Sequence, residues 1–334
     1  MKNYSFMKIV VYQILLAALI LSACQGRPPQ PTETPTPTLT PTETPHFLAT
    51  RPAATIEPGT PEPTLKLFPT FTPAALVTDV KKIDIGGRKL NLVCLGGGSK
   101  TVVFDSDLGA DSQAWSTVMQ MAPGEVRLCA YDRAGLGASD PTSTPRTSQQ
   151  MADDLKALLS KGHVAGPFIL VAHGMASFDA ILYAHKYPHE VAAIILVDGS
   201  HPDQYARSSA ILPTAAPDDS PALAASRSRL TGLQPAQNPE GLDFDASAGQ
   251  VRAVKSLGGV PLAVVSRHPL ESIPGVPPEV VASLEQDWTA MQNELAALSS
   301  ASIHTIAGHA GHNIPGEEPE LVAAAISNLL SMLK

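Results

Sequence analysis

Strand-like apolar runs alternate with helical patterns through most of this 334-residue chain. The expected strands lie at 80–86, 90–96, 101–106, 125–132, 167–173, 191–198, 260–267 and 302–308. The expected helices lie at 149–159, 176–187, 278–298 and 319–333, and Ser148 is placed to cap the first of them. This alternation predicts an α/β fold with a mostly parallel sheet and helices on both faces. Gly-Gly-Arg between the first two strands favours a hairpin.

Residues 203–256 interrupt the alternation. They are rich in Ala, Ser, Pro and Asp and contain no clear strand. Polar and small residues follow several of the expected strands, at the carboxyl ends where sheets of this kind build their sites. We therefore predict that residues 203–256 are an insertion that covers the site as a lid.

The first 76 residues are expected to stay outside this fold. Lys2 and Lys8 precede a short apolar run, which is typical of an export signal. The run ends in Leu-Ser-Ala-Cys, which resembles the lipobox of bacterial lipoproteins. By that resemblance residues 1–23 are a signal peptide, and Cys24 carries lipid that anchors the protein in a bilayer. An ordinary signal peptide with an incidental cysteine is the alternative.

Residues 24–76 are rich in Pro and Thr and predict a disordered stalk, because such a segment buries too little apolar surface to offset ordering its backbone. Residues 77–334 remain for one domain. The formal net charge of −8 and the absence of a basic run argue against nucleic-acid binding. No CxxC pair is present, and Pro188 interrupts the spacing between His185 and His189. We expect no metal site and no cofactor.

Cys94 and Cys129 both lie in expected strands. Exported proteins meet oxidising conditions, which permit a disulfide. Two buried free thiols are the alternative.

Four segments resemble the α/β-hydrolase family, of the alpha/beta-hydrolase-1 type: 130–140, 169–177, 187–204 and 311–314. They occur in the family's order, and the resemblance covers residues 78–334. It implies an eight-stranded sheet, a nucleophile at a sharp turn between strand and helix, an oxyanion hole, an acid and a late histidine. It also implies that the second and fourth strands are neighbours, which favours a disulfide between the two cysteines.

The resemblance assigns the late histidine, the general base, to His312, with His309 as a weaker candidate. Asp198 is favoured as the acid because some members keep their acid after the sixth strand. Glu271 is the alternative, as the carboxylate nearest to the more usual place after the seventh strand. A purely structural aspartate is the other interpretation of Asp198.

The nucleophile position departs from the family's pattern because it holds Gly174, which has no side chain. Ser106 and Asp107 stand where the family often has His-Gly, and a carboxylate there repels the charge that an oxyanion hole stabilises. The amide of Met175 remains at a helix N-terminus and can still bind an anion. We therefore expect Ser106, Asp107 and Met175 to contact a ligand.

The changes at the nucleophile position and in the oxyanion region together favour loss of serine-hydrolase chemistry. The leading hypothesis is a lipid-anchored protein on the extracytoplasmic face of the membrane that binds a small-molecule or ester-like ligand without turnover. A second hypothesis is an enzyme in which the His312–Asp198 pair activates water. A third is a hydrolase with a displaced serine, and Ser106, Ser177 and Ser200 are the candidates.

Overall fold

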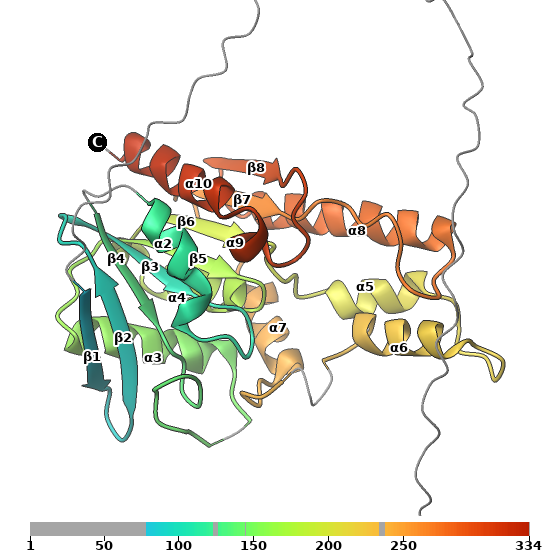
Figure 1. The fold of residues 1–334 in the computed structure, drawn as a ribbon, viewed down its shortest axis with the longest axis horizontal. Coiled ribbons are helices and arrows are strands. Elements are labelled where there is room, and N and C mark those ends of the chain that lie inside the picture. The colour runs from blue at the N-terminus through green and yellow to red at the C-terminus, as the bar shows by residue number, and fades with distance from the viewer. Residues whose placement is uncertain (1–77, 123–125, 144, 234–237, 334) are drawn as a thin grey trace, which may run out of the picture. The chain divides into compact units, whose positions relative to one another are not determined.

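The computed structural model describes residues 78–122, 126–143, 145–233 and 238–333, which form a sheet with helices on both faces (Figure 1). The predicted signal peptide, Cys24 and the stalk lie outside the described residues. The strands are β1 (Thr78–Asp84), β2 (Lys89–Leu95), β3 (Lys100–Asp105), β4 (Val126–Tyr131), β5 (Phe168–His173), β6 (Val191–Val197), β7 (Leu262–Ser266) and β8 (Ser302–Ile306). The predicted fold class is confirmed.

The helical elements include short 3₁₀ helices and several α-helices that the sequence does not predict. They are η1 (Ser112–Trp115), α2 (Ser116–Met121), α3 (Ser148–Lys161), α4 (Ala176–Lys186), η2 (Pro188–Glu190), α5 (Gln204–Ile211), α6 (Pro221–Leu230), α7 (Phe244–Ala253), α8 (Pro278–Ala296), α9 (Ile314–Glu317) and α10 (Pro319–Met332). None of the helices within the described ranges is long and apolar enough to cross a bilayer.

The described strands form one sheet in the order β1-β2-β4-β3-β5-β6-β7-β8. β2 pairs antiparallel with β1 and β4, and β3 to β8 run parallel. Cys94 on β2 lies directly opposite Cys129 on β4, and the two form a disulfide. The carboxyl ends of six parallel strands therefore meet at one edge, where a site can form.

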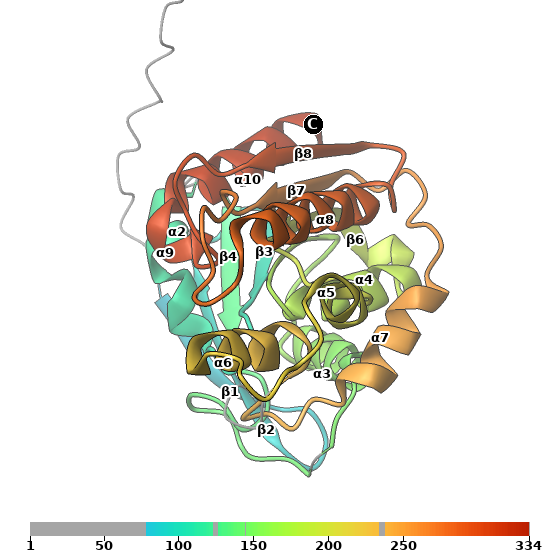
Figure 2. The same ribbon diagram turned by 90° about the vertical axis from the view of Figure 1, so that its right-hand side faces the viewer.

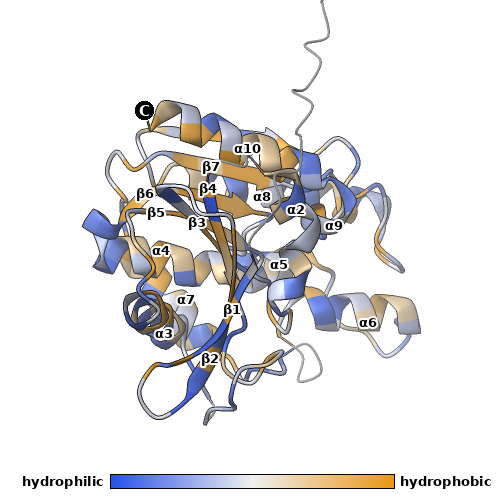
Figure 3. Cartoon of the chain, turned by 60° about the vertical axis from the view of Figure 1, so that its left-hand side comes forward, coloured by the Kyte–Doolittle hydropathy of each residue, from blue (hydrophilic) through white to orange (hydrophobic). Residues whose placement is uncertain are grey.

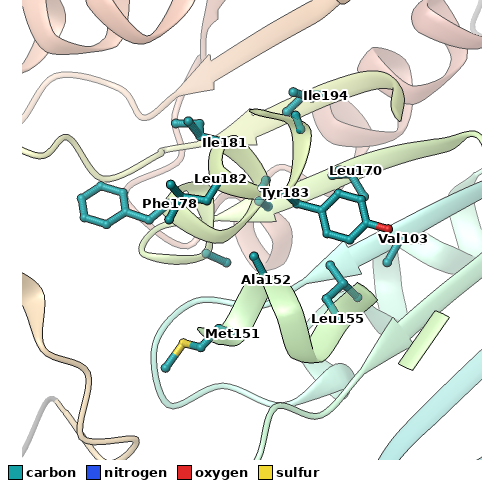
Figure 4. Packing of buried hydrophobic residues seen from close by; sticks show 14 of the residues in the cluster. Val103, Met151, Ala152, Leu155, Leu170, Phe178, Ile181, Leu182, Tyr183 and Ile194 are labelled. Carbon is teal, nitrogen blue, oxygen red and sulfur yellow. The ribbon is translucent and has the colours of Figure 1, made fainter. Parts of the chain in front are cut away.

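One face of the sheet is covered by α3 and α4. Leu155 of α3 and the buried side chains of α4, among them Ile181 and Tyr183, pack towards Val103 and Leu170 of the sheet (Figure 4). Each fully buried apolar side chain contributes about 1.5–3 kcal/mol relative to an exposed one. This cluster holds the N-terminus of α4 firmly against the strand ends.

The opposite face is covered by η1, α2 and α10. Trp115, Val118 and Ile326 are fully buried against the sheet. α10 carries both hydrophobic and hydrophilic residues (Figure 3), and the residues that it buries, Val322, Ala323, Ile326 and Leu329, are all hydrophobic. The β8–α10 connection, which carries His312, is therefore held in place by apolar residues packed against the sheet.

The expected cap of the first predicted helix is wrong by one residue. The N-cap of α3 is Thr147, which forms a capping box with Gln150. Ser148 is the first helical residue, and its backbone N–H donates to the hydroxyl of Ser247. Threonine can accept hydrogen bonds from the free amides of the first turn as serine would. The type of side chain therefore does not tell which of these two neighbouring residues is the N-cap.

The predicted lid, residues 203–256, divides into two parts. α5 and α6 line the cavity at the strand ends, whereas α7 packs beside α3 and α4 (Figure 2). Ala248 and Val251 of α7 are buried in the same apolar cluster as α4. Of the helices that the structure describes in this segment, α5 and α6 line the cavity, and α7 belongs to the body of the domain.

Candidate active site

Four residues that the sequence singles out meet at the carboxyl edge of the sheet. Asp107 follows β3, Gly174 separates β5 from α4, Asp198 follows β6, and His312 lies between β8 and α9. Hydrogen bonds link Asp107, His312 and Asp198 in one chain. The site is therefore assembled from four separate strand ends.

Gly174 forms the sharp turn between β5 and α4. Its φ of +53° lies in the left-handed region, which glycine adopts without strain. Its N–H donates to the carbonyl of Val197 (3.0 Å), and its own carbonyl accepts the N–H of Ser200 (3.0 Å). A Cβ at this position would lie 2.0 Å from Oδ1 of Asp107. The Asp107 carboxylate therefore occupies the space in which any side chain at residue 174 would begin.

Asp107 is also the anion that the turn binds. Its Oδ1 accepts the N–H of Met175 (2.8 Å), at the start of α4, and its Oδ2 lies 3.0 Å from Nε2 of His312. Burial alone would raise the pKa of Asp107, but the hydrogen bond and charge of His312 outweigh it and hold the pKa well below its usual range. The sequence led us to expect that Asp107 opposes anion binding by the Met175 amide. It is instead the carboxylate that this amide binds.

His312 lies between two carboxylates. Its Nδ1 is 2.6 Å from Oδ2 of Asp198, whose Oδ1 accepts the N–H of Arg267 (3.1 Å). A carboxylate only accepts hydrogen bonds, so both ring nitrogens of His312 carry protons. Burial lowers the pKa of His312, but the hydrogen bonds and charges of Asp107 and Asp198 raise it to about 10. The resting site thus holds an imidazolium between two anions.

This arrangement predicts an unusual titration. The imidazole of His312 stays protonated at neutral pH, and its contribution to stability is present below pH 6.5 and lost as the pH rises through about 10. Because 51% of its side chain is exposed, solvent screens the gain, and we expect about 1–2 kcal/mol. Asp107→Asn should lower the pKa of His312, measured by NMR of the ring Cε1–H. Asp218→Asn, at an exposed lid position, should not.

His173 is a site residue that sequence reasoning missed. It is buried, and its Nε2 donates to the backbone carbonyl of His312 at 2.7 Å. The two rings also stack with their centroids 4.6 Å apart. His173 therefore positions His312 on its loop. Its place directly before the glycine of the turn was the available signal.

Among the described residues, the other predicted candidates are not the hydrogen-bond partners of the His312 ring. The hydroxyl of Ser106 donates to the backbone carbonyl of Asp111 (2.7 Å). The buried hydroxyl of Ser177 donates to the backbone carbonyl of Ser200 (3.2 Å). Ser200 itself lines the cavity. Glu271 and His309 are exposed, and the carboxylate beside Nδ1 of His312 is that of Asp198. The hydrogen-bond partners of both His312 ring nitrogens are carboxylates, so none of these hydroxyls is in the place of a displaced nucleophile.

A buried ion cluster fixes the loop that carries Asp107. The Arg133 guanidinium pairs with Asp105 (2.5 Å) and Glu240 (2.7 Å) and donates to the backbone carbonyls of Ser106 and Asp107. Glu240 in turn accepts the N–H of Gly109 at 2.8 Å. This cluster sets the backbone on which Asp107 stands.

A cavity of about 710 Å³ opens in front of these groups. Asp107, Met175, Asp198 and His312 form its base, and residues of α5 and α6, including Tyr205, form its other side. This volume suits a small organic molecule. Within the residues that the structure describes, we find no group of three or more His, Cys, Asp or Glu side chains arranged to hold a metal ion.

The sequence profile of the alpha/beta hydrolase family matches residues 92–325. The chain belongs to this family. Uncharacterized protein YbdG of Bacillus subtilis (strain 168) is 31% identical over 125 residues, which are 37% of this chain and 38% of that protein. Uncharacterized protein YqjL of the same organism is 31% identical over 103 residues, 31% of this chain and 41% of that protein. The chain thus matches about two fifths of the length of these relatives.

Solved structures support the same fold. A thermophilic esterase from Thermogutta terrifontis, solved with malate bound, has a TM-score of 0.50 and 20% identity, and the match covers 78% of this chain and 99% of that one. A hydrolase fold of this kind is compatible with binding a small molecule or an ester.

Proposed function

We propose that this α/β-hydrolase-fold protein binds a small molecule in the cavity at the strand ends and does not act as a serine hydrolase. One observation carries the proposal: the Asp107 carboxylate fills the space next to Gly174 and takes the amide of Met175. Glycine offers no hydroxyl for attack, and an acyl intermediate at residue 174 is impossible. An external oxyanion would also have to displace Asp107 from that amide.

The alternative functions have less support. A displaced serine nucleophile needs its hydroxyl hydrogen-bonded to a ring nitrogen of His312. The partners of both His312 ring nitrogens are carboxylates instead. A His312–Asp198 pair that activates water directly needs a neutral imidazole. The two flanking carboxylates favour the charged form instead.

A fluorophosphonate probe tests the loss of serine chemistry. We expect no covalent labelling of the full chain in detergent at neutral pH, and no hydrolysis of short-chain p-nitrophenyl esters above the buffer rate. An active serine hydrolase treated in parallel is the positive control. Labelling that disappears in Ser200→Ala would contradict the proposal and establish a displaced nucleophile.

We also propose that the protein is held on the extracytoplasmic face of a membrane by lipid on Cys24. The Leu-Ser-Ala-Cys sequence supports this, and so does the disulfide between Cys94 and Cys129, since disulfides persist mainly outside the cytosol. Cys24→Ala should move the protein from the membrane to the soluble fraction of a bacterial host and end its labelling by radioactive palmitate. Membrane retention of Cys24→Ala would show that the anchor lies elsewhere.

A further inference from the structure

We propose that two copies of this chain pair through the free edges of their β8 strands, antiparallel about a two-fold axis at His304, and so form a closed dimer with one continuous sheet. The residues of β8 do not line the ligand cavity, so the proposal goes beyond the binding function and does not depend on it. It follows from the unpaired edge of β8, from its lack of charge and from the symmetry of its outward backbone groups.

β8 is the last strand of the sheet, and β7 is its partner (Figure 2). The N–H of Leu262 donates to the carbonyl of Ala301 (3.0 Å), and the N–H of Ala307 donates to the carbonyl of Ser266 (2.8 Å). The direction of the backbone groups alternates along a strand, so every second residue of β8 points away from β7. The residues whose backbone groups point outwards, with no backbone partner in the part of the chain that the structure describes, are Ser302, His304 and Ile306.

β8 lacks the charges that usually keep an exposed edge from pairing with another chain. The opposite edge of the sheet, β1, follows the usual pattern and carries Asp79, Lys81, Lys82 and Asp84. By contrast, residues 295–316, which include β8, contain no Asp, Glu, Lys or Arg. Burial lowers the pKa of His304, so its imidazole is neutral at neutral pH. A second copy of β8 can therefore approach this edge without like-charge repulsion.

Two large apolar side chains of β8 are exposed in the single chain. Ile303 is 62% exposed and Ile306 is 47% exposed. Side chains alternate across a strand, so these two lie on opposite faces of the sheet. β-Branched side chains are stabilised by packing against a facing strand. Pairing of two β8 strands would cover apolar surface on both faces of the joint.

The outward backbone groups are symmetric about His304, which fixes the register. In an antiparallel pair centred there, His304 faces His304 of the second copy and Ser302 faces Ile306, and each facing pair exchanges two backbone hydrogen bonds. Ile303 then faces Thr305, and the two Ile303 side chains become diagonal neighbours beside the axis. Each copy contributes the same surface, so the assembly closes as a dimer and leaves β1 unpaired.

Sedimentation equilibrium of the full chain in density-matched detergent tests the assembly. We expect a monomer–dimer equilibrium with a micromolar dissociation constant, because the edge of one short strand is smaller than a standard interface. Ile303→Lys places like charges beside the axis and should weaken the dimer about tenfold or more. Val80→Lys is the matched control, because Val80 is 59% exposed on β1, and it should leave the dimer unchanged. A wild type that stays monomeric up to its solubility limit, or that forms open-ended assemblies, would overturn the proposal.

Proline substitutions separate the outward backbone groups from the inward ones. Ser302→Pro removes an N–H that is paired only in the dimer, so it should weaken the dimer about tenfold and leave the unfolding temperature of the monomer unchanged. Ile303→Pro removes an N–H that faces β7 and should lower that temperature. Dimers that persist undiminished in both Ile303→Lys and Ser302→Pro would show that the interface lies elsewhere.

Introduced cysteines test the register. Residue 303 and residue 305 of the second copy form a non-hydrogen-bonded pair in the proposed register, with Cα atoms about 4.5 Å apart, which permits a disulfide. An equimolar mixture of Ile303→Cys and Thr305→Cys chains, oxidised without denaturant, should therefore give a covalent dimer faster than either variant alone. A mixture of Val80→Cys and Lys82→Cys, spaced in the same way on β1, should give none. Equal crosslinking on both edges, or no crosslinking of a β8 mixture that sediments as a dimer, would contradict the assignment.

Discussion

Introducing a serine at residue 174 alone should leave the protein without ester hydrolysis, whereas Gly174→Ser combined with Asp107→Gly should gain it. The single variant places a Cβ where Oδ1 of Asp107 lies, 2.0 Å away, so one of the two side chains must move. The φ of +53° adds about 1–3 kcal/mol of strain for a non-glycine residue. The single variant should therefore unfold at lower temperature than the wild type.

The double variant removes the obstacle and frees the Met175 amide. His312 then has one carboxylate partner, Asp198, so its pKa should return towards the range of a general base. We expect p-nitrophenyl acetate hydrolysis about 10²-fold or more above either single variant, the order that a positioned base contributes. Fluorophosphonate labelling of the introduced serine would confirm the assignment.

Asp107→Gly alone is the matched control for this gain, since it frees the amide without supplying a hydroxyl. If Gly174→Ser hydrolyses esters while Asp107 is present, the carboxylate moves aside easily and does not block the site. If the double variant folds but stays inactive, freeing the Met175 amide and His312 from Asp107 does not suffice for ester hydrolysis, and the prediction is wrong.

The fold could be predicted from the sequence because its central strands β5, β6 and β7 are nearly continuous apolar runs. The expected 167–173 differs from β5 by one residue, and 191–198 from β6 by one. α6 could not be predicted, because Ser226 is its only buried residue within the described structure and it therefore has no apolar stripe. Elements that cover a site and bury little leave a weak pattern in the sequence.

The site was only partly predictable for a related reason. The turn at Gly174 and the loop at His312 lie within segments that resemble the family, so the sequence brought them together. The direction of the Asp107 side chain depends on the Arg133 and Glu240 contacts to its loop, from residues 26 and more than 100 positions away. No local pattern encodes such contacts. The sequence therefore indicated that Asp107 belongs to the site but not that it occupies the nucleophile's space.

Arg133→Met should destabilise the protein by about 3–5 kcal/mol, because it removes one member of a buried ion cluster and leaves the others unpaired. The side chains of Arg133, Asp105 and Glu240 are all at least 95% buried. Methionine fills most of the volume, so the loss reports on charge more than on packing. Urea unfolding at neutral pH measures it. Arg127→Met, on the β4 strand that precedes Arg133, is the control, because its guanidinium lies 3.8 Å from Asp79 near the surface and should contribute less than about 1 kcal/mol.

The pH dependence separates a lost charge pair from a lost contact. In the wild type, burial raises the pKa of Glu240 but Arg133 outweighs it, so the net pKa is lowered and this part of the stability is lost as the pH falls. Without Arg133 the buried carboxyls should take up protons more readily in the folded state than in the unfolded one. The stability difference between Arg133→Met and the wild type should therefore narrow from neutral pH to about pH 5. A difference that stays constant over this range would mean that Arg133 acts by filling space, and that its charge does not hold the Asp107 loop.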